Sequence, residues 1–134
     1  MNRPKIIRLI AQAWLLLVIV GSLQPARPWH SVAVHRGIHW LAFAGLALVL
    51  LLPSRNPRQE IHSVIAACLL GLSLEYLQHL VYLKPIEWWD VRDDTFAILA
   101  AFALYRLAGT CRAVFAATRC PAESETVSPA KAVR

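Results

Sequence analysis

The amino-acid sequence predicts an all-α fold, namely a polytopic membrane bundle of about four transmembrane helices. Of the 134 residues, 57% are hydrophobic and only 16% are charged, whereas soluble domains contain about 45–50% apolar residues. The apolar residues also gather into four long segments, and a helix needs about 20 such residues to cross the bilayer core. We therefore expect a transmembrane domain over residues 1–118 and a disordered cytoplasmic tail over residues 119–134.

The four expected spans are 6–23, 36–53, 61–83 and 92–112. The first and third are long enough as they stand. The second reaches a full length only by including polar residues at its start, and Pro53 ends it. Arg106 interrupts the fourth, but its long stem can carry the charge towards the nearer surface. The first span also resembles a secretory signal; because no convincing cleavage site follows it, we expect an uncleaved anchor.

Lysine and arginine are distributed unevenly among the joints. They gather at both termini and in the joint at 53–60, whereas the joint KPIEWWDVRDD is net acidic. Because cytoplasmic loops carry an excess of basic residues, we expect both termini inside, and Trp29, Trp88 and Trp89 at the outer boundary. The basic residues form no stripe on one folded face, so we expect no nucleic-acid partner.

Motifs of soluble enzymes and metal sites are missing from the sequence. It contains no C-x-x-C pair, no G-x-S-x-G, no phosphate loop and no H-E-x-x-H. We therefore expect no metal and no cofactor. Cys68 lies inside the third span, while Cys111 and Cys120 fall on the expected cytoplasmic side, where thiols stay reduced.

Polar residues form a stripe on the third span. Gly71, Glu75, Gln78 and Tyr82 recur at spacings of four, three and four, which places them on one helix face. A charge near the bilayer centre costs about 2.5–3.5 kcal/mol, so this face should contact protein rather than lipid. Counted from the cytoplasmic end, Glu75 lies in the outer half of the helix.

Further polar residues come to the same depth from the neighbouring spans. His39 is about one turn inside the outer end of the second span, and Asp90 and Asp94 share one face at the outer start of the fourth. Asp90 is expected to be the N-cap of that helix, with Asp93 at the third helical position. The residues expected to converge in the outer leaflet are His39, Glu75, Gln78, Asp90 and Asp94.

These residues also have structural interpretations, although Asp94, four residues after Asp90, is harder to explain in that way. Glu75 is either interhelical glue or a ligand-binding or proton-exchanging group, and the excess of nearby carboxyl groups makes us favour the second. Gln78 fits glue better, His39 fits an interfacial residue, and Asp90 needs no role beyond capping. The histidines expected to be solvated or interfacial are His30, His35 and His79.

Two stretches resemble the signature regions of the VanZ-like family, which is named for a small membrane protein associated with teicoplanin resistance. The first is HRGIHW, where the family has an acidic residue, a basic residue, two others, a histidine and an aromatic residue. Arg36, His39 and Trp40 match this pattern, and His35 stands where the family has the acidic residue.

The second stretch is GLSLEYLQHLVYLKPIEWWDVRDDTFA. The residues that match the family pattern are Gly71, Glu75, Gln78 and Asp90. Lys84 replaces an arginine, Asp94 an asparagine and Ala97 a glycine. The similarity covers roughly residues 6 to 110, and it adds Arg36 and Lys84 to the expected polar cluster.

The resemblance implies a multi-pass protein of the bacterial cytoplasmic membrane, linked to envelope or glycopeptide tolerance. We expect it to bind membrane lipid, a lipid-linked cell-wall intermediate or a lipoglycopeptide; the oligomeric state stays open. One alternative is a membrane-embedded enzyme acting on a lipid head group, with Glu75 or Asp94 as acid or base and His39 assisting. The other is a small proton or ion path.

Overall fold

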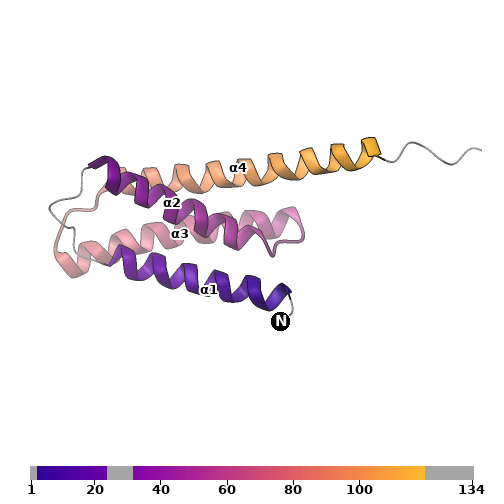
Figure 1. The fold of residues 1–134 in the computed structure, drawn as a ribbon. Coiled ribbons are helices and arrows are strands. Elements are labelled where there is room, and N and C mark those ends of the chain that lie inside the picture. The colour runs from indigo at the N-terminus through magenta and orange to yellow at the C-terminus, as the bar shows by residue number, and fades with distance from the viewer. Residues whose placement is uncertain (1–2, 24–31, 120–134) are drawn as a thin grey trace, which may run out of the picture.

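The computed structural model describes residues 3–23 and 32–119, which form four α-helices and no strand. The helices are α1 (Arg3–Ser22), α2 (Val32–Leu51), α3 (Pro57–Tyr82) and α4 (Trp88–Arg119) (Figure 1). All four are long and apolar enough to cross a membrane. The all-α prediction with four spans is therefore confirmed, and the chain has the architecture of a multi-pass membrane protein. Trp29, His30 and the predicted tail beyond Arg119 lie outside the described residues.

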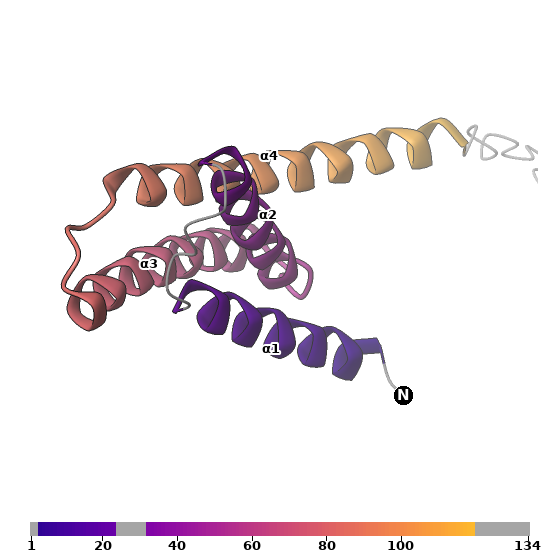
Figure 2. The ribbon, with the colours of Figure 1, turned by 60° about the vertical axis from the view of Figure 1, so that its left-hand side comes forward.

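Successive helices run in opposite directions, with α2 and α3 between α1 and α4 in both ribbon views (Figures 1 and 2). α2 packs most extensively against α4, whereas α1 contacts only α2 and α3 among the described helices. We call the end where α2 and α4 begin the polar end, and the end where α1 and α3 begin the basic end. The N-terminus of α1 and the C-terminus of α4 both lie towards the basic end (Figure 1).

α3 begins four residues before the predicted span because a polar turn caps it. The side chain of Asn56 accepts a hydrogen bond from the backbone N–H of Gln59 at 2.9 Å, and Pro57 occupies the first helical position. Gln59 in turn accepts from the backbone N–H of Arg55 at 2.8 Å. At the other end Leu83 has a left-handed backbone, with φ of 53°, and terminates the helix.

The predicted N-cap at Asp90 is wrong, since α4 begins at Trp88. The carbonyl of Glu87 accepts from the backbone N–H groups of Asp90 and Val91, at 2.9 and 3.4 Å, so Glu87 occupies the cap position. Asp90 lies inside the first turn, where its charge still suits the positive end of the helix dipole. The aspartate is buried rather than exposed at a cap, which directs its carboxylate towards α2.

α4 passes through Arg106 without a break because the arginine finds a partner on another helix. Its Nη1 donates to Oε2 of Glu60 in the first turn of α3, at 2.9 Å. At 1.5 Å per residue, the 32 residues of α4 span about 48 Å, more than the roughly 30 Å of a bilayer core. The last part of α4 accordingly extends past the other helices (Figure 1).

The core is apolar and contains many small side chains. Its buried members are Val18, Phe43, Leu46, Ala47, Ala67, Leu74, Ala97, Ile98 and Ala101. Small residues let helix backbones approach closely, which is the usual packing in membranes. At Gly45, an added Cβ would collide with the ring of Trp14, whose indole N–H donates to the carbonyl of Ala42 at 2.9 Å. Gly45 therefore permits the α1–α2 contact.

Candidate functional site

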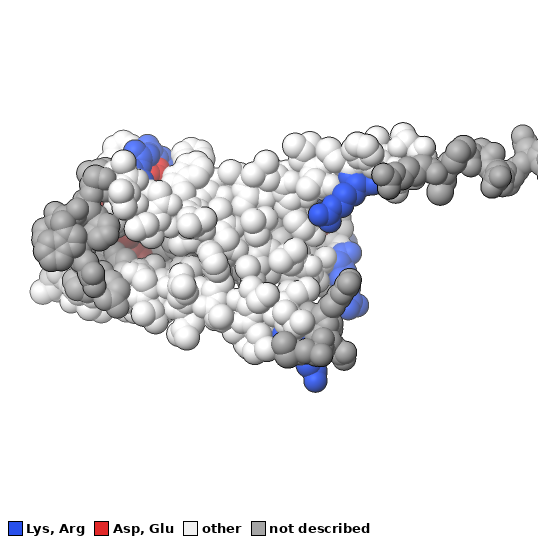
Figure 3. Space-filling view, viewed as in Figure 1, with Lys and Arg blue, Asp and Glu red and all other residues white. Residues whose placement is uncertain are grey.

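Polar side chains of α2 and α4 meet at the polar end of the bundle. We define the α2–α4 polar cluster as His35, Arg36, His39, Asp90, Arg92, Asp93 and Asp94. The space-filling view shows blue and red atoms side by side at this end, a largely white surface along the bundle, and blue atoms at the basic end (Figure 3). The cluster is thus separated along the bundle axis from the basic side chains at the other end.

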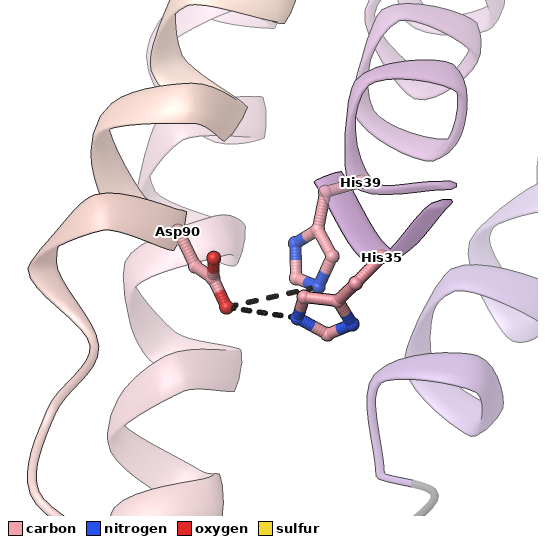
Figure 4. A group of neighbouring side chains, drawn as sticks. All are labelled: His35, His39 and Asp90. Carbon is pink, nitrogen blue, oxygen red and sulfur yellow. Dashed lines mark hydrogen bonds and ion pairs between the residues drawn. The ribbon is translucent and has the colours of Figure 1, made fainter. Parts of the chain in front are cut away.

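The two histidines face two aspartates. Nδ1 of His39 lies 3.0 Å from Oδ1 of Asp94, within hydrogen-bond distance. Oδ2 of Asp90 lies 3.3 Å from Nε2 of His35 and 3.9 Å from Nε2 of His39 (Figure 4). Below them His39 stacks on Phe43, with ring centroids 6.2 Å apart. Because Phe43 belongs to the core, this stacking separates the polar cluster from the apolar interior.

The two arginines share one buried aspartate. Nε of Arg36 donates to Oδ2 of Asp93 at 2.6 Å, and Nη2 of Arg92 donates to Oδ1 of Asp93 at 2.8 Å. The side chain of Asp93 is only 2% exposed, whereas those of Arg36 and Arg92 are 50% and 42% exposed. Arg92 also lies over the ring of Trp89, 4.4 Å from its centroid. The carboxylate therefore fixes two guanidinium groups that remain open to the surroundings.

The cluster holds more negative than positive charge when its histidines are neutral. Two guanidinium groups and three carboxylates sum to −1. All three aspartates are buried, and a buried charge is costly unless it is paired. The arrangement consequently favours a compensating positive charge beside His35 and His39, which an imidazolium or a bound cation would supply.

Glu75 joins α3 to the start of α4. Its buried carboxylate accepts a hydrogen bond from the backbone N–H of Glu87 at 2.7 Å, and it lies within electrostatic range of His39 and Asp90. Gly71, one turn earlier on α3, lies close to both Phe43 and Asp94. Glu75 is thus next to the cluster, and its direct partner is the backbone at the cap of α4.

Gln78 and Lys84 do not join the cluster. Nε2 of Gln78 donates to the carbonyl of Ser22, and the hydroxyl of Tyr82 donates to that of Leu23 at 2.5 Å. These bonds tie α3 to the end of α1, as expected for interhelical glue. Lys84 is exposed, and within residues 3–23 and 32–119 its side chain has no hydrogen-bond or ion-pair partner.

Sequence reasoning missed three members of the cluster. The sequence predicts a solvated or interfacial His35 and a place for Asp93 in the helix cap, and it gives no prediction for Arg92. The signal was available in the spacing: His35 precedes His39 by four residues, and Asp93 follows Asp90 by three, so each pair shares a helix face. What the spacing does not show is that these two faces meet.

The geometry suits two kinds of ligand. The half-exposed guanidinium groups of Arg36 and Arg92 match a planar or tetrahedral anion such as a carboxylate or phosphate. The donor atoms of His35, His39 and Asp90 lie close enough together to hold a metal ion.

No model of a known protein family matches the chain, and no curated protein or solved structure compared with it matches either.

Proposed function

We propose that this chain is a VanZ-like protein of the bacterial cytoplasmic membrane, whose α2–α4 polar cluster binds the anionic head group of a surface ligand in the outer leaflet. The ligand class is a lipid-linked cell-wall intermediate or a lipoglycopeptide, and binding links the protein to envelope or teicoplanin tolerance. One observation carries this proposal. Two half-exposed arginines are fixed on a single buried aspartate at the end of an otherwise apolar bundle.

The two guanidinium groups are arranged for recognition rather than for stability alone. Each carries five N–H donors, and the contacts to Asp93 use only part of them. A buried carboxylate needs a positive partner, and one arginine would supply the charge that Asp93 requires. The second guanidinium group adds free N–H donors where a phosphate or carboxylate can bind.

The surroundings of the arginines match a lipid–water boundary. Trp88 and Trp89 precede Arg92 in the first turn of α4 and are both largely exposed, as amphipathic rings are at membrane interfaces. The apolar faces of the helices would hold the lipid tail, and the cluster would hold its head group. This division supports a lipid-anchored ligand over a small soluble anion.

Binding in nanodiscs tests the proposal directly. The purified chain is mixed with a pyrophosphate-linked cell-wall lipid, the same lipid without its sugar, or a zwitterionic lipid, and the bound lipid is quantified by mass spectrometry. We expect selective retention of the two anionic lipids, weakened at least about tenfold in Arg36→Gln and Arg92→Gln, because each substitution removes a charge-assisted contact. The matched control is Arg58→Gln at the basic end.

Equal binding by Arg36→Gln and Arg58→Gln would reject the cluster as the anion site. Equal retention of the anionic and the zwitterionic lipids by the wild type would reject the proposed ligand class. The cellular counterpart is the teicoplanin sensitivity of cells expressing the wild type or Arg36→Gln at equal membrane level.

A membrane-embedded enzyme is the second candidate, favoured by one specific contact. Asp94 accepts a hydrogen bond from Nδ1 of His39 and so orients the imidazole, leaving Nε2 to accept a proton as a general base does. Turnover of the lipid head group by the purified chain separates this candidate from a binder. Asp94→Asn would then reduce turnover far more than lipid binding.

A further inference from the structure

We propose that His35, His39 and Asp90 form a site for one divalent transition-metal ion of the zinc class. The inference goes beyond head-group binding and does not depend on it. It also departs from the expectation of no metal, which rested on motifs that keep their ligands close in sequence. Here the ligands come from two helices, and the histidine and aspartate positions are more than fifty residues apart.

The donor atoms lie close to the spacing of a metal site. One donor atom from each residue lies within 4.8 Å of the other two (Figure 4). Ligand atoms about 2.0–2.2 Å from a tetrahedral zinc ion are roughly 3.3–3.6 Å apart. Oδ2 of Asp90 is 3.3 Å from His35 Nε2, within this range, and 3.9 Å from His39 Nε2, slightly beyond it.

The backbone holds these donors in place before any ion arrives. His35 and His39 are four residues apart on α2, which sets both rings on one face, with centroids 4.6 Å apart. Two histidines at this spacing are a common way for a helix to present two ligands to zinc. Asp90 is buried in the first turn of α4, the helix against which α2 packs most extensively.

Asp94 supplies an independent observation that points to a ligand. Histidines that bind metals through one ring nitrogen donate the other N–H to a carboxylate or carbonyl, which fixes the tautomer. Nδ1 of His39 is 3.0 Å from Oδ1 of Asp94, a buried carboxylate. When His39 donates from Nδ1, the lone pair of Nε2 points to the space shared with Asp90.

Charge and chemistry select the class of ion. The cluster carries −1 with neutral histidines, so a divalent cation changes its sign to +1 and compensates the buried aspartates. Imidazole donors favour zinc and similar ions over magnesium or calcium. Three protein ligands leave a fourth position for water or a ligand oxygen, and the 45% exposed side chain of His35 borders open space.

Zinc binding by the full chain in nanodiscs tests the proposal. The protein is stripped with a chelator and titrated with Zn²⁺ in competition with a chromogenic chelator, and bound zinc is counted by elemental analysis. We expect one zinc ion per chain. His39→Gln and Asp90→Asn, which keep size and polarity, should lose stoichiometric binding, while Asp94→Asn should weaken it by about 10–100-fold as an outer partner.

His62→Ala, an exposed histidine near the start of α3, is the matched control and should bind zinc as the wild type does. Zinc should also raise the melting temperature of the wild type and His62→Ala, and leave that of His39→Gln unchanged. Binding of less than one equivalent by a folded wild type overturns the proposal and leaves an imidazolium–aspartate cluster. Equal affinity in the wild type, His39→Gln and Asp90→Asn overturns it as well.

Discussion

Glu75 shows how one residue can satisfy two interpretations of the same sequence. A carboxylate inside an apolar helix suggested a ligand-binding or proton-exchanging group, because other acids were expected at its depth. Its direct bond in the structure is to the backbone N–H of Glu87, which an amide oxygen could equally accept. The contact explains why a polar acceptor is needed at position 75, and it does not by itself require a charge.

Substitution of Glu75 separates the acceptor from the charge. We expect Glu75→Gln to insert and fold almost as the wild type does, and Glu75→Ala to lose about 1–3 kcal/mol, because the N–H of Glu87 loses its partner. Thermal unfolding in detergent and membrane level measure this difference. A well-folded Glu75→Gln protein that loses lipid binding or teicoplanin tolerance would show that the charge itself acts.

Asp90 is the second residue whose role can be tested singly. Asp90→Ser would preserve a helix cap, but Asp90 lies within the first turn and faces His35 instead. We therefore expect Asp90→Ser to be no more stable than Asp90→Ala, since neither restores the charge opposite the histidines. Circular dichroism melts of both variants provide the measurement, and recovery of wild-type stability by serine alone would return Asp90 to a capping role.

At the scale of elements, glycine determines how closely α1 approaches α2. The Trp14 ring occupies the space that a side chain at position 45 would need, and its indole N–H bonds the carbonyl of Ala42. Gly37 lies on the same helix, with nothing within 4 Å of the place where its Cβ would be. The two positions differ in packing and share the same helical backbone.

Alanine at these two glycines should have opposite effects. Gly45→Ala should destabilise the bundle by about 1–3 kcal/mol, because the Trp14 ring must move and its hydrogen bond breaks. Gly37→Ala should be neutral or stabilising by up to about 1 kcal/mol, since alanine is the better helix former. Thermal unfolding and Trp14 fluorescence report both, and equal stability of the two variants would contradict the packing argument.

At the scale of the whole molecule, charge divides the bundle into two ends. Arg55 in the α2–α3 joint and Arg58 in the first turn of α3 lie at the end where α1 begins, and the arginine–aspartate cluster lies at the other (Figures 1 and 3). Cytoplasmic loops are enriched in lysine and arginine. We therefore expect the basic end to face the cytoplasm, and this orientation would place the polar cluster in the outer leaflet.

Cysteine labelling tests this orientation with residues that the chain already offers. In a Cys120→Ser background, the exposed Cys111 on the far part of α4 should react with a membrane-impermeant thiol reagent in inverted vesicles and not in intact cells. Trp88→Cys, in a chain without other cysteines, should react with the same reagent in intact cells and not in inverted vesicles. Labelling of Cys111 in intact cells would move the cluster to the cytoplasmic side and exclude a surface ligand.

Composition and hydrophobic segmentation alone determined the helical class and the number of spans, because crossing a membrane imposes a minimum apolar length that can be counted along the chain. Helix ends were less accurate: α3 begins in a polar capped turn and α4 starts at Trp88, two residues before the predicted cap. Local hydrogen bonds decide where a helix begins and ends, and these bonds cannot be inferred from the length of an apolar segment. Depth along the helices was predictable, because rise per residue is constant.

Only the tertiary structure decided which side chains at that depth touch. It joined His35, His39 and Arg36 of α2 to three aspartates of α4, and it gave Gln78 instead to the end of α1. A one-dimensional pattern fixes which residues share a face of their own helix, but the rotation of each helix about its axis depends on packing with its neighbours. That rotation is set by close contacts such as Gly45 with Trp14 and Gly71 with Phe43, which pair residues far apart in the chain.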